Sequence, residues 1–254
     1  MKLSKYSKIS INFIIISISL LVWVLLLVNP GNIMTMEHCH VSASGPSAVS
    51  LKMLLEMNPF SSQLLGWGLM VVAMMLPKLI VPIQLINMQS LKRNRFINAL
   101  LFVLGYVLIW MVTGVFMIAI IMTLNLLLPM SYLPALGFMI VAIIWQFSPI
   151  KQQCLNRGHE HWTLSAFGWA AKRDAFVYGI YHGLWCVGAG WALMLFPMLL
   201  PTGHNLAMIV VTFIMISEHM EHPQLPRWNF SLRLKLIKIL IAQTRIKVQQ
   251  LVTV

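Results

Sequence analysis

Six apolar stretches, separated by loops of very unequal charge, constrain this chain more than any other feature. A hydrocarbon core about 30 Å thick is crossed by about 20 apolar residues of helix, because each residue advances the helix axis by about 1.5 Å. The expected spans are 11–28, 64–86, 97–124, 133–147, 176–200 and 205–217. The fourth and sixth are short, and partial insertion of the sixth is an open alternative. The sequence predicts an all-α, polytopic membrane helix bundle with six transmembrane helices.

The basic residues indicate which side of the membrane each loop occupies. They precede the first span and gather after the second, fourth and sixth spans, whereas the other loops contain only one, Lys52. Because loops rich in Lys and Arg stay on the cytoplasmic side, six crossings place both termini in the cytoplasm. We expect one integral domain, 1–254, in the inner or plasma membrane. Its expected connections are an outer loop 29–63, inner loops 87–96 and 148–175, and an amphipathic cytoplasmic tail 224–254.

Composition and charge narrow the class of protein. The chain is 59% hydrophobic and only 9% charged, which excludes an ordinary soluble domain. A net charge of +12 would suggest nucleic acid in a soluble protein. Here the basic residues flank apolar spans, where they meet lipid headgroups, so membrane lipids are the expected partner and nucleic acid is not.

The expected outer loop contains the first group of potential metal ligands. His38, Cys39 and His40 are consecutive, and Met34 and Met36 precede them. Imidazole, thiolate and thioether are the ligands that copper and zinc prefer. The alternative is a solvated loop with an isolated cysteine.

The fifth span contains a second group. A spacing of four residues places Tyr178, His182, Cys186, Gly190 and Met194 along one stripe of a helix. A histidine within the hydrocarbon layer is costly and normally faces the bundle interior with a partner. The stripe therefore predicts either a metal site or close packing, in which glycines bring helices together and the cysteine acts as a small apolar residue.

The second span combines methionines with a proline and a lysine. Met74 and Met75 are candidate soft ligands, although core packing explains them equally well. Pro77 breaks the helical hydrogen-bond ladder, which needs a nearby group to satisfy the freed carbonyl. We expect Lys78 to extend to the inner interface, with a structural or ion-pairing role left open.

A third group is expected at the inner surface. Its members are Cys154, His159, His161, Glu218, His219 and His222. On a continuous helix, Glu218 and His222 would be four residues apart and His219 and His222 three apart, spacings that place two ligands on one ion. The alternative is a set of polar caps at the membrane interface.

Three segments resemble the DUF2182 family, whose members are described as integral membrane proteins with a predicted metal site. The segments are the Trp67-to-Pro77 stretch (W-x-x-M-x-x-A-M-M-L-P), Lys151-x-x-Cys154-Leu155, and the stretch from His182 to Met194. Glu218 stands near the end of the resemblance, which implies a metal, with copper the usual suggestion. Two paired cysteines of the family are replaced here by Ala189 and Gly190, and a small residue after the proline is replaced by Lys78. Another family cysteine after Leu155 is replaced by Arg157 and His159.

These observations favour a membrane protein that binds copper, with zinc as a second candidate. In this hypothesis the outer loop captures the ion, the fifth span passes it on, and the inner group receives it, for transport or for delivery to a membrane oxidase. The alternative is a structural or assembly subunit of a larger membrane complex. An oxidoreductase with a haem or quinone is disfavoured, since axial haem ligation needs facing histidines within the membrane and His182 is the only deep one. We do not expect an enzyme.

Overall fold

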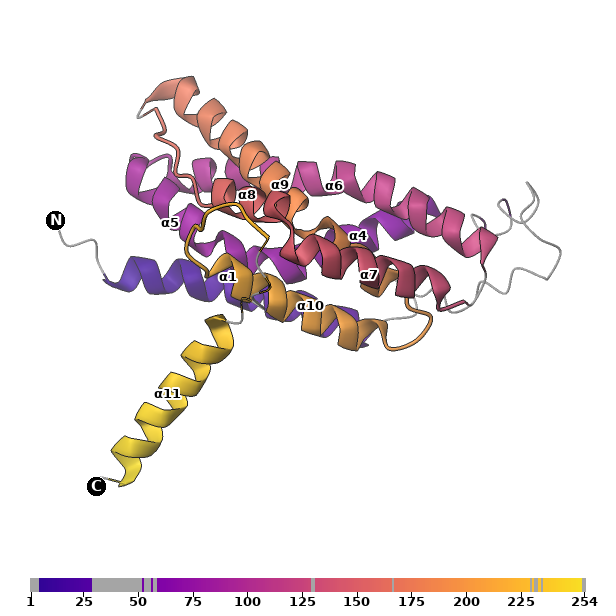
Figure 1. Ribbon diagram of the computed structural model, residues 1–254. Coiled ribbons are helices and arrows are strands. Elements are labelled where there is room, and N and C mark those ends of the chain that lie inside the picture. Colours follow the sequence, from indigo (N-terminus) through magenta and orange to yellow (C-terminus); the bar gives the residue numbers. More distant parts are fainter. Residues whose placement is uncertain are drawn as a thin grey trace.

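The computed structural model describes residues 5–28, 52, 56, 59–128, 131–165, 167–228, 230, 233 and 235–252. Within these residues every regular element is a helix (Figure 1), so the predicted all-α class is confirmed for the described part of the chain. The helices are α1 Lys5–Val28, α4 Phe60–Met75, the 3₁₀ helix η1 Leu76–Leu79, α5 Ile80–Gln89, α6 Arg95–Leu127, α7 Leu133–Phe147, α8 Pro149–Gly158, α9 Gly168–Met198, α10 His204–His219 and α11 Lys235–Val252.

Three helical segments among the described residues are long and apolar enough to cross a membrane. They are Phe60–Gln89, which comprises α4, η1 and α5, together with α6 and α9. The number becomes four if α7 and α8, bent by 67° at Ser148, form one broken span. Apolar helices Asn12–Val28 and α10 are shorter. The fold is therefore compatible with a membrane protein, while the six-span arrangement and the side of the termini stay predictions.

Pro77 divides the second expected span, as the sequence predicts. A proline has no amide N–H to donate to the carbonyl four residues earlier, which here is Ala73. The hydroxyl of Ser19 in α1 donates to that carbonyl at 2.7 Å. The chain continues through the tighter η1 turn before α5 begins. The break thus gives the backbone 3₁₀ geometry at Lys78 and is compensated by a side chain of another helix.

Helix α9 lies at the centre of the bundle and contacts α6, α7, α8 and α10. Its contact with α6 is very close: a Cβ added to Gly179 would lie 2.1 Å from the carbonyl oxygen of Phe102. In the opposite direction, a Cβ on Gly105 would lie 2.4 Å from the carbonyl oxygen of Phe176. Small residues therefore allow the two backbones to approach each other, as expected for helices packed in a membrane.

The expected inner loop 148–175 is more ordered than predicted. It contains α8, which begins with Pro149 after Ser148, whose hydroxyl accepts a hydrogen bond from the Lys151 amide at 3.1 Å. This is a standard helix start, with a serine cap followed by proline. In addition, α9 begins at Gly168 rather than at Phe176. Sequence reading placed these segments in a loop because their polar residues lack the apolar signal of a span.

The expected tail 224–254 contains the helix α11, which points away from the bundle (Figure 1). Its first turn is tied to α10, because the buried Ser217 hydroxyl donates to the Arg233 carbonyl at 2.8 Å and accepts from the Leu236 amide at 3.1 Å. The cytoplasmic location of this tail stays a prediction.

Candidate metal site

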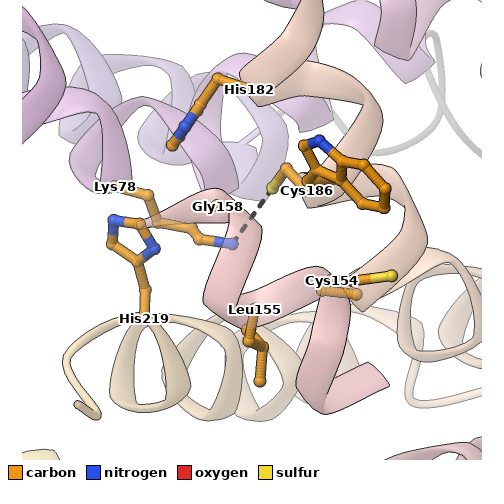
Figure 2. Close-up of a pocket in the computed structure, with 9 residues that line it drawn as sticks. Lys78, Cys154, Leu155, Gly158, His182, Cys186 and His219 are labelled. Atoms are coloured by element: carbon orange, nitrogen blue, oxygen red, sulfur yellow. Dashed lines mark hydrogen bonds between the residues drawn. The ribbon is translucent and has the colours of Figure 1, made fainter. Parts of the chain in front are cut away.

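A small cavity lies where η1, α8, α9 and α10 meet, with room for about one water molecule. Its walls combine two thiols, two imidazoles and an ammonium group (Figure 2). The lining residues are Lys78, Cys154, Leu155, Gly158, His182, Trp185, Cys186, Ala189 and His219. Four of them, Cys154, His182, Cys186 and His219, are ligands that the sequence singled out, and they come from three different helices.

Cys186 of α9 is buried and accepts two hydrogen bonds. Lys78 Nζ donates to its Sγ at 3.2 Å, and the hydroxyl of Tyr106 in α6 donates at 3.1 Å. Lys78 is only 6% exposed, so the expectation that it reaches the inner interface is wrong. The η1 turn directs the lysine into the bundle, where its ammonium group donates a hydrogen bond to the sulfur of Cys186.

His182 lies one helical turn before Cys186 on the same inward face of α9, and it is 3% exposed. Its imidazole is surrounded by the rings of Phe102, Tyr106 and Tyr178, with centroid distances of 5.8, 5.9 and 6.1 Å. Among the described residues, none forms a hydrogen bond with its ring nitrogens. The inward orientation of the predicted stripe is therefore confirmed, and the His182 imidazole is available to a ligand in the cavity.

Cys154 brings the second thiol from α8. It is buried beside Leu155 and Ala189, and both Cys154 and Cys186 are free thiols. A Cβ added to Gly188 would lie 2.8 Å from the Cys154 sulfur, so the absence of a side chain at Gly188 is what lets α8 approach α9 at this point.

Two histidines adjoin the cavity near its α10 side. The ring of His219 lies edge-on to that of His182, with a centroid distance of 6.1 Å, and it faces the backbone of Lys78. The ring of His159 stacks on His219 at 5.2 Å. However, Nδ1 of His159 is 2.7 Å from the Leu155 carbonyl and its Nε2 is 2.9 Å from the His219 carbonyl. Both ring nitrogens of His159 therefore face carbonyl oxygens, which leaves neither nitrogen free to bind a metal.

Glu218 is also occupied. Its carboxylate forms a buried ion pair with Lys151 at 2.9 Å and accepts a hydrogen bond from Gln146. The predicted helical spacing from Glu218 to His222 does not occur, because α10 ends at His219. Pro223 explains the early end, since the residue before a proline disfavours the α conformation.

The remaining candidates lie away from the cavity. His161 and His222 are exposed, and Met74 and Met75 are each 1% exposed within the hydrophobic core. The residues His38, Cys39 and His40 lie outside the described residues. Sequence reasoning missed Tyr106 as a donor to Cys186. The signal was present, because a tyrosine hydroxyl deep in an apolar span normally has a partner.

The donors are not assembled into a finished coordination shell. Within the described part of the chain, no group of three or more His, Cys, Asp or Glu residues is placed to hold a metal ion. The donor types nevertheless fit a soft ion, because thiolate selects copper(I) and imidazole is compatible with it. The cavity thus provides suitable donor atoms, but side chains must move before three or more of these donors can bind one ion.

The fold and the cavity define an all-helical protein whose apolar helices enclose sulfur and nitrogen donors. Residues 64–232, more than half of the chain, match the PpoB2 family model, which is described as a copper chaperone. The chain therefore belongs to this copper chaperone family, and all nine lining residues fall within the matched region. No curated protein and no solved structure matches the chain. The expectation of copper is supported at the level of the family, whereas zinc has no support.

Proposed function

We propose that this protein is a membrane-embedded copper chaperone that holds copper(I) in the cavity and passes it to a copper-using protein, such as a membrane oxidase. The observation that carries the proposal is that Cys154, His182, Cys186 and His219 line one small cavity. Membership of the copper chaperone family supports copper as the cargo.

Cys186 and His182 are the central ligands in this proposal. They stand four residues apart on α9, so about 6 Å of helix rise separates them and rotation of both side chains brings them to one ion. Cys154 and His219 approach from α8 and α10 and can replace them in turn. Exchange among a few donors gives weak and reversible binding, which suits delivery better than storage.

The wider arrangement completes the proposal. Six crossings with both termini in the cytoplasm would place the loop with His38, Cys39 and His40 on the outer side, where it captures the ion. The cavity would then receive the ion from that side. The protein acts by binding and release and catalyses no reaction.

Metal analysis of the purified protein tests this function. The protein is purified anaerobically in detergent, and bound copper, zinc and iron are measured for the unaltered chain and for His182→Ala, Cys186→Ala and the double variant. We expect nearly one copper per chain, and a sharp loss in the double variant. His161→Ala removes an exposed imidazole and is the matched control, with copper unchanged.

Two outcomes would count against the proposal. Copper that is retained by the double variant would place the metal elsewhere in the chain. Protein that is free of metal and co-purifies with a partner would instead favour a structural or assembly subunit of a larger complex.

A further inference from the structure

We propose that the ammonium group of Lys78 occupies the position that copper(I) takes beside Cys186, so that the lysine and the metal exclude one another. This inference rests on the proposed function and adds that a side chain of the protein itself competes with copper(I) for the sulfur of Cys186. Copper enters when the lysine withdraws, and the return of the lysine favours release.

The first argument is geometric. Lys78 Nζ lies 3.2 Å from Cys186 Sγ, and the Tyr106 hydroxyl lies 3.1 Å from the same sulfur. Figure 2 shows the lysine reaching into the cavity, with its nitrogen between His219 and Cys186. The phenol and the ammonium each occupy one side of the sulfur, and of these two groups Lys78 is the one that lines the cavity, on the side from which a metal in the cavity would approach.

The second argument is the balance of charge. Among the described residues, no carboxylate lies within ion-pairing distance of Lys78, and the nearby Glu218 is paired with Lys151. The groups that face Lys78 are the sulfur of Cys186 and the imidazoles of His182 and His219. None of these imidazoles carries a negative charge that could balance a second cation.

Copper(I) and the ammonium would therefore be two positive charges beside one sulfur in a buried site. Coulomb repulsion between neighbouring charges is large where water is excluded, and an uncompensated buried charge is strongly unfavourable. Copper binding thus requires Lys78 to leave the sulfur. With the lysine in place, the cavity has room for only about one water molecule. Withdrawal of the lysine side chain would enlarge it and make space for the ion.

Such competition has a purpose in a chaperone. A buried thiol with no competitor would hold copper(I) tightly and release it slowly. An ammonium tethered to η1 always stays near the site, so it lowers the affinity for copper(I) and returns to the sulfur when the ion is transferred.

The test compares copper(I) affinities of Lys78→Gln and Lys78→Ala with that of the unaltered protein. Affinity is measured anaerobically in detergent by competition with bathocuproine disulfonate. We expect both variants to bind copper(I) at least about tenfold more tightly, a change equivalent to about 1.4 kcal/mol. Lys92→Gln is the matched control, because it removes the same charge from an exposed lysine and should leave the affinity unchanged.

Two further measurements keep the proposal testable if a Lys78 variant folds poorly. The double variant Lys78→Gln/Cys186→Ala should lose the gain in affinity. In the unaltered protein, copper(I) should increase the acetylation of Lys78 by an N-hydroxysuccinimide ester, detected by mass spectrometry.

The outcomes separate this inference from the proposed function. If the unaltered protein binds copper through Cys186 and the Lys78 variants bind it equally or more weakly, the competition is wrong and the chaperone proposal stands. The competition is also wrong if the gain in copper(I) affinity persists in the Lys78→Gln/Cys186→Ala variant. It is wrong as well if copper(I) does not change the acetylation of Lys78. If the unaltered protein and the Lys78 variants all bind no copper, both proposals fail.

Discussion

Lys151 and Glu218 form an ion pair that is almost completely buried, with 2.9 Å between Nζ and Oε1. Gln146 joins the pair, because its Oε1 accepts from Lys151 Nζ at 2.6 Å and its amide nitrogen donates to Glu218. The three residues connect α7, α8 and α10. The carboxylate that the sequence offered as a metal ligand therefore neutralises a lysine and fixes the helices around the cavity.

Glu218→Ala should destabilise the protein by about 3–5 kcal/mol, because it leaves the buried charge of Lys151 without an opposite charge. The double variant Lys151→Met/Glu218→Leu should lose much less, since it removes both charges together. Unfolding in detergent, followed by circular dichroism, measures the difference. Equal losses in the single and double variants would show that the charges do not interact. Copper per folded protein should stay unchanged in the double variant, because neither residue lines the cavity and no buried charge is left unpaired.

The hydrogen bond from Ser19 to the Ala73 carbonyl gives a second prediction. Ser19→Ala should cost about 1–3 kcal/mol, because the carbonyl beside Pro77 is then buried without a donor. Pro77→Ala restores a backbone N–H for that carbonyl, so the same serine substitution should cost clearly less in the Pro77→Ala background. A double-mutant cycle of unfolding free energies measures this coupling. Additive losses would contradict the compensation.

Sequence reasoning worked best where one physical signal dominated. The expected span 97–124 lies inside α6, and the stripe through His182 and Cys186 faces inward as its spacing predicted. The break at Pro77 was also predictable, because proline lacks a donor whatever its surroundings. Apolar length and helical periodicity are properties of a single segment, so they can be read without knowledge of the neighbouring helices.

Relationships between segments could not be read in the same way. The direction of Lys78 depends on the η1 turn and on a sulfur in α9, which is distant in the chain. The pairing of Glu218 depends on the 67° bend between α7 and α8, which brings Lys151 to α10. A polar residue in an apolar span signals that a partner exists, but its identity follows only from the packing.

The contact of α6 with α9 should tolerate no side chain at Gly179. Gly179→Ala would place a Cβ 2.1 Å from the carbonyl oxygen of Phe102, and a backbone atom cannot move aside without separating the helices. We expect a loss of several kcal/mol, comparable with severe overpacking of a core. Gly137→Ala in α7 is the control, because nothing lies within 4 Å of the added atom. A mild effect at Gly179, similar to that at Gly137, would contradict the close approach. Thermal unfolding of both variants in detergent provides the measurement.

Ala189→Cys should strengthen copper binding, because it adds a thiol to the wall of the cavity beside Cys154. The DUF2182 resemblance places a cysteine at this position, and Ala189 is better suited to the change than Gly190. A Cβ at Gly190 would lie 2.2 Å from the terminal methyl of Met215, which would have to shift. With three thiols near one ion, we expect copper(I) affinity to rise by about tenfold or more, equivalent to at least about 1.4 kcal/mol.

The measurement is the same anaerobic competition assay, with a reductant present so that the new thiol cannot form a disulfide with Cys154. Ala170→Cys adds a thiol at the exposed start of α9 and serves as the control, with no change in affinity expected. An equal gain in both variants would mean that any added thiol binds copper, independently of the cavity. A folded Ala189→Cys protein with unchanged affinity would show that copper does not enter the space between α8 and α9, which would remove Cys154 from the proposed site.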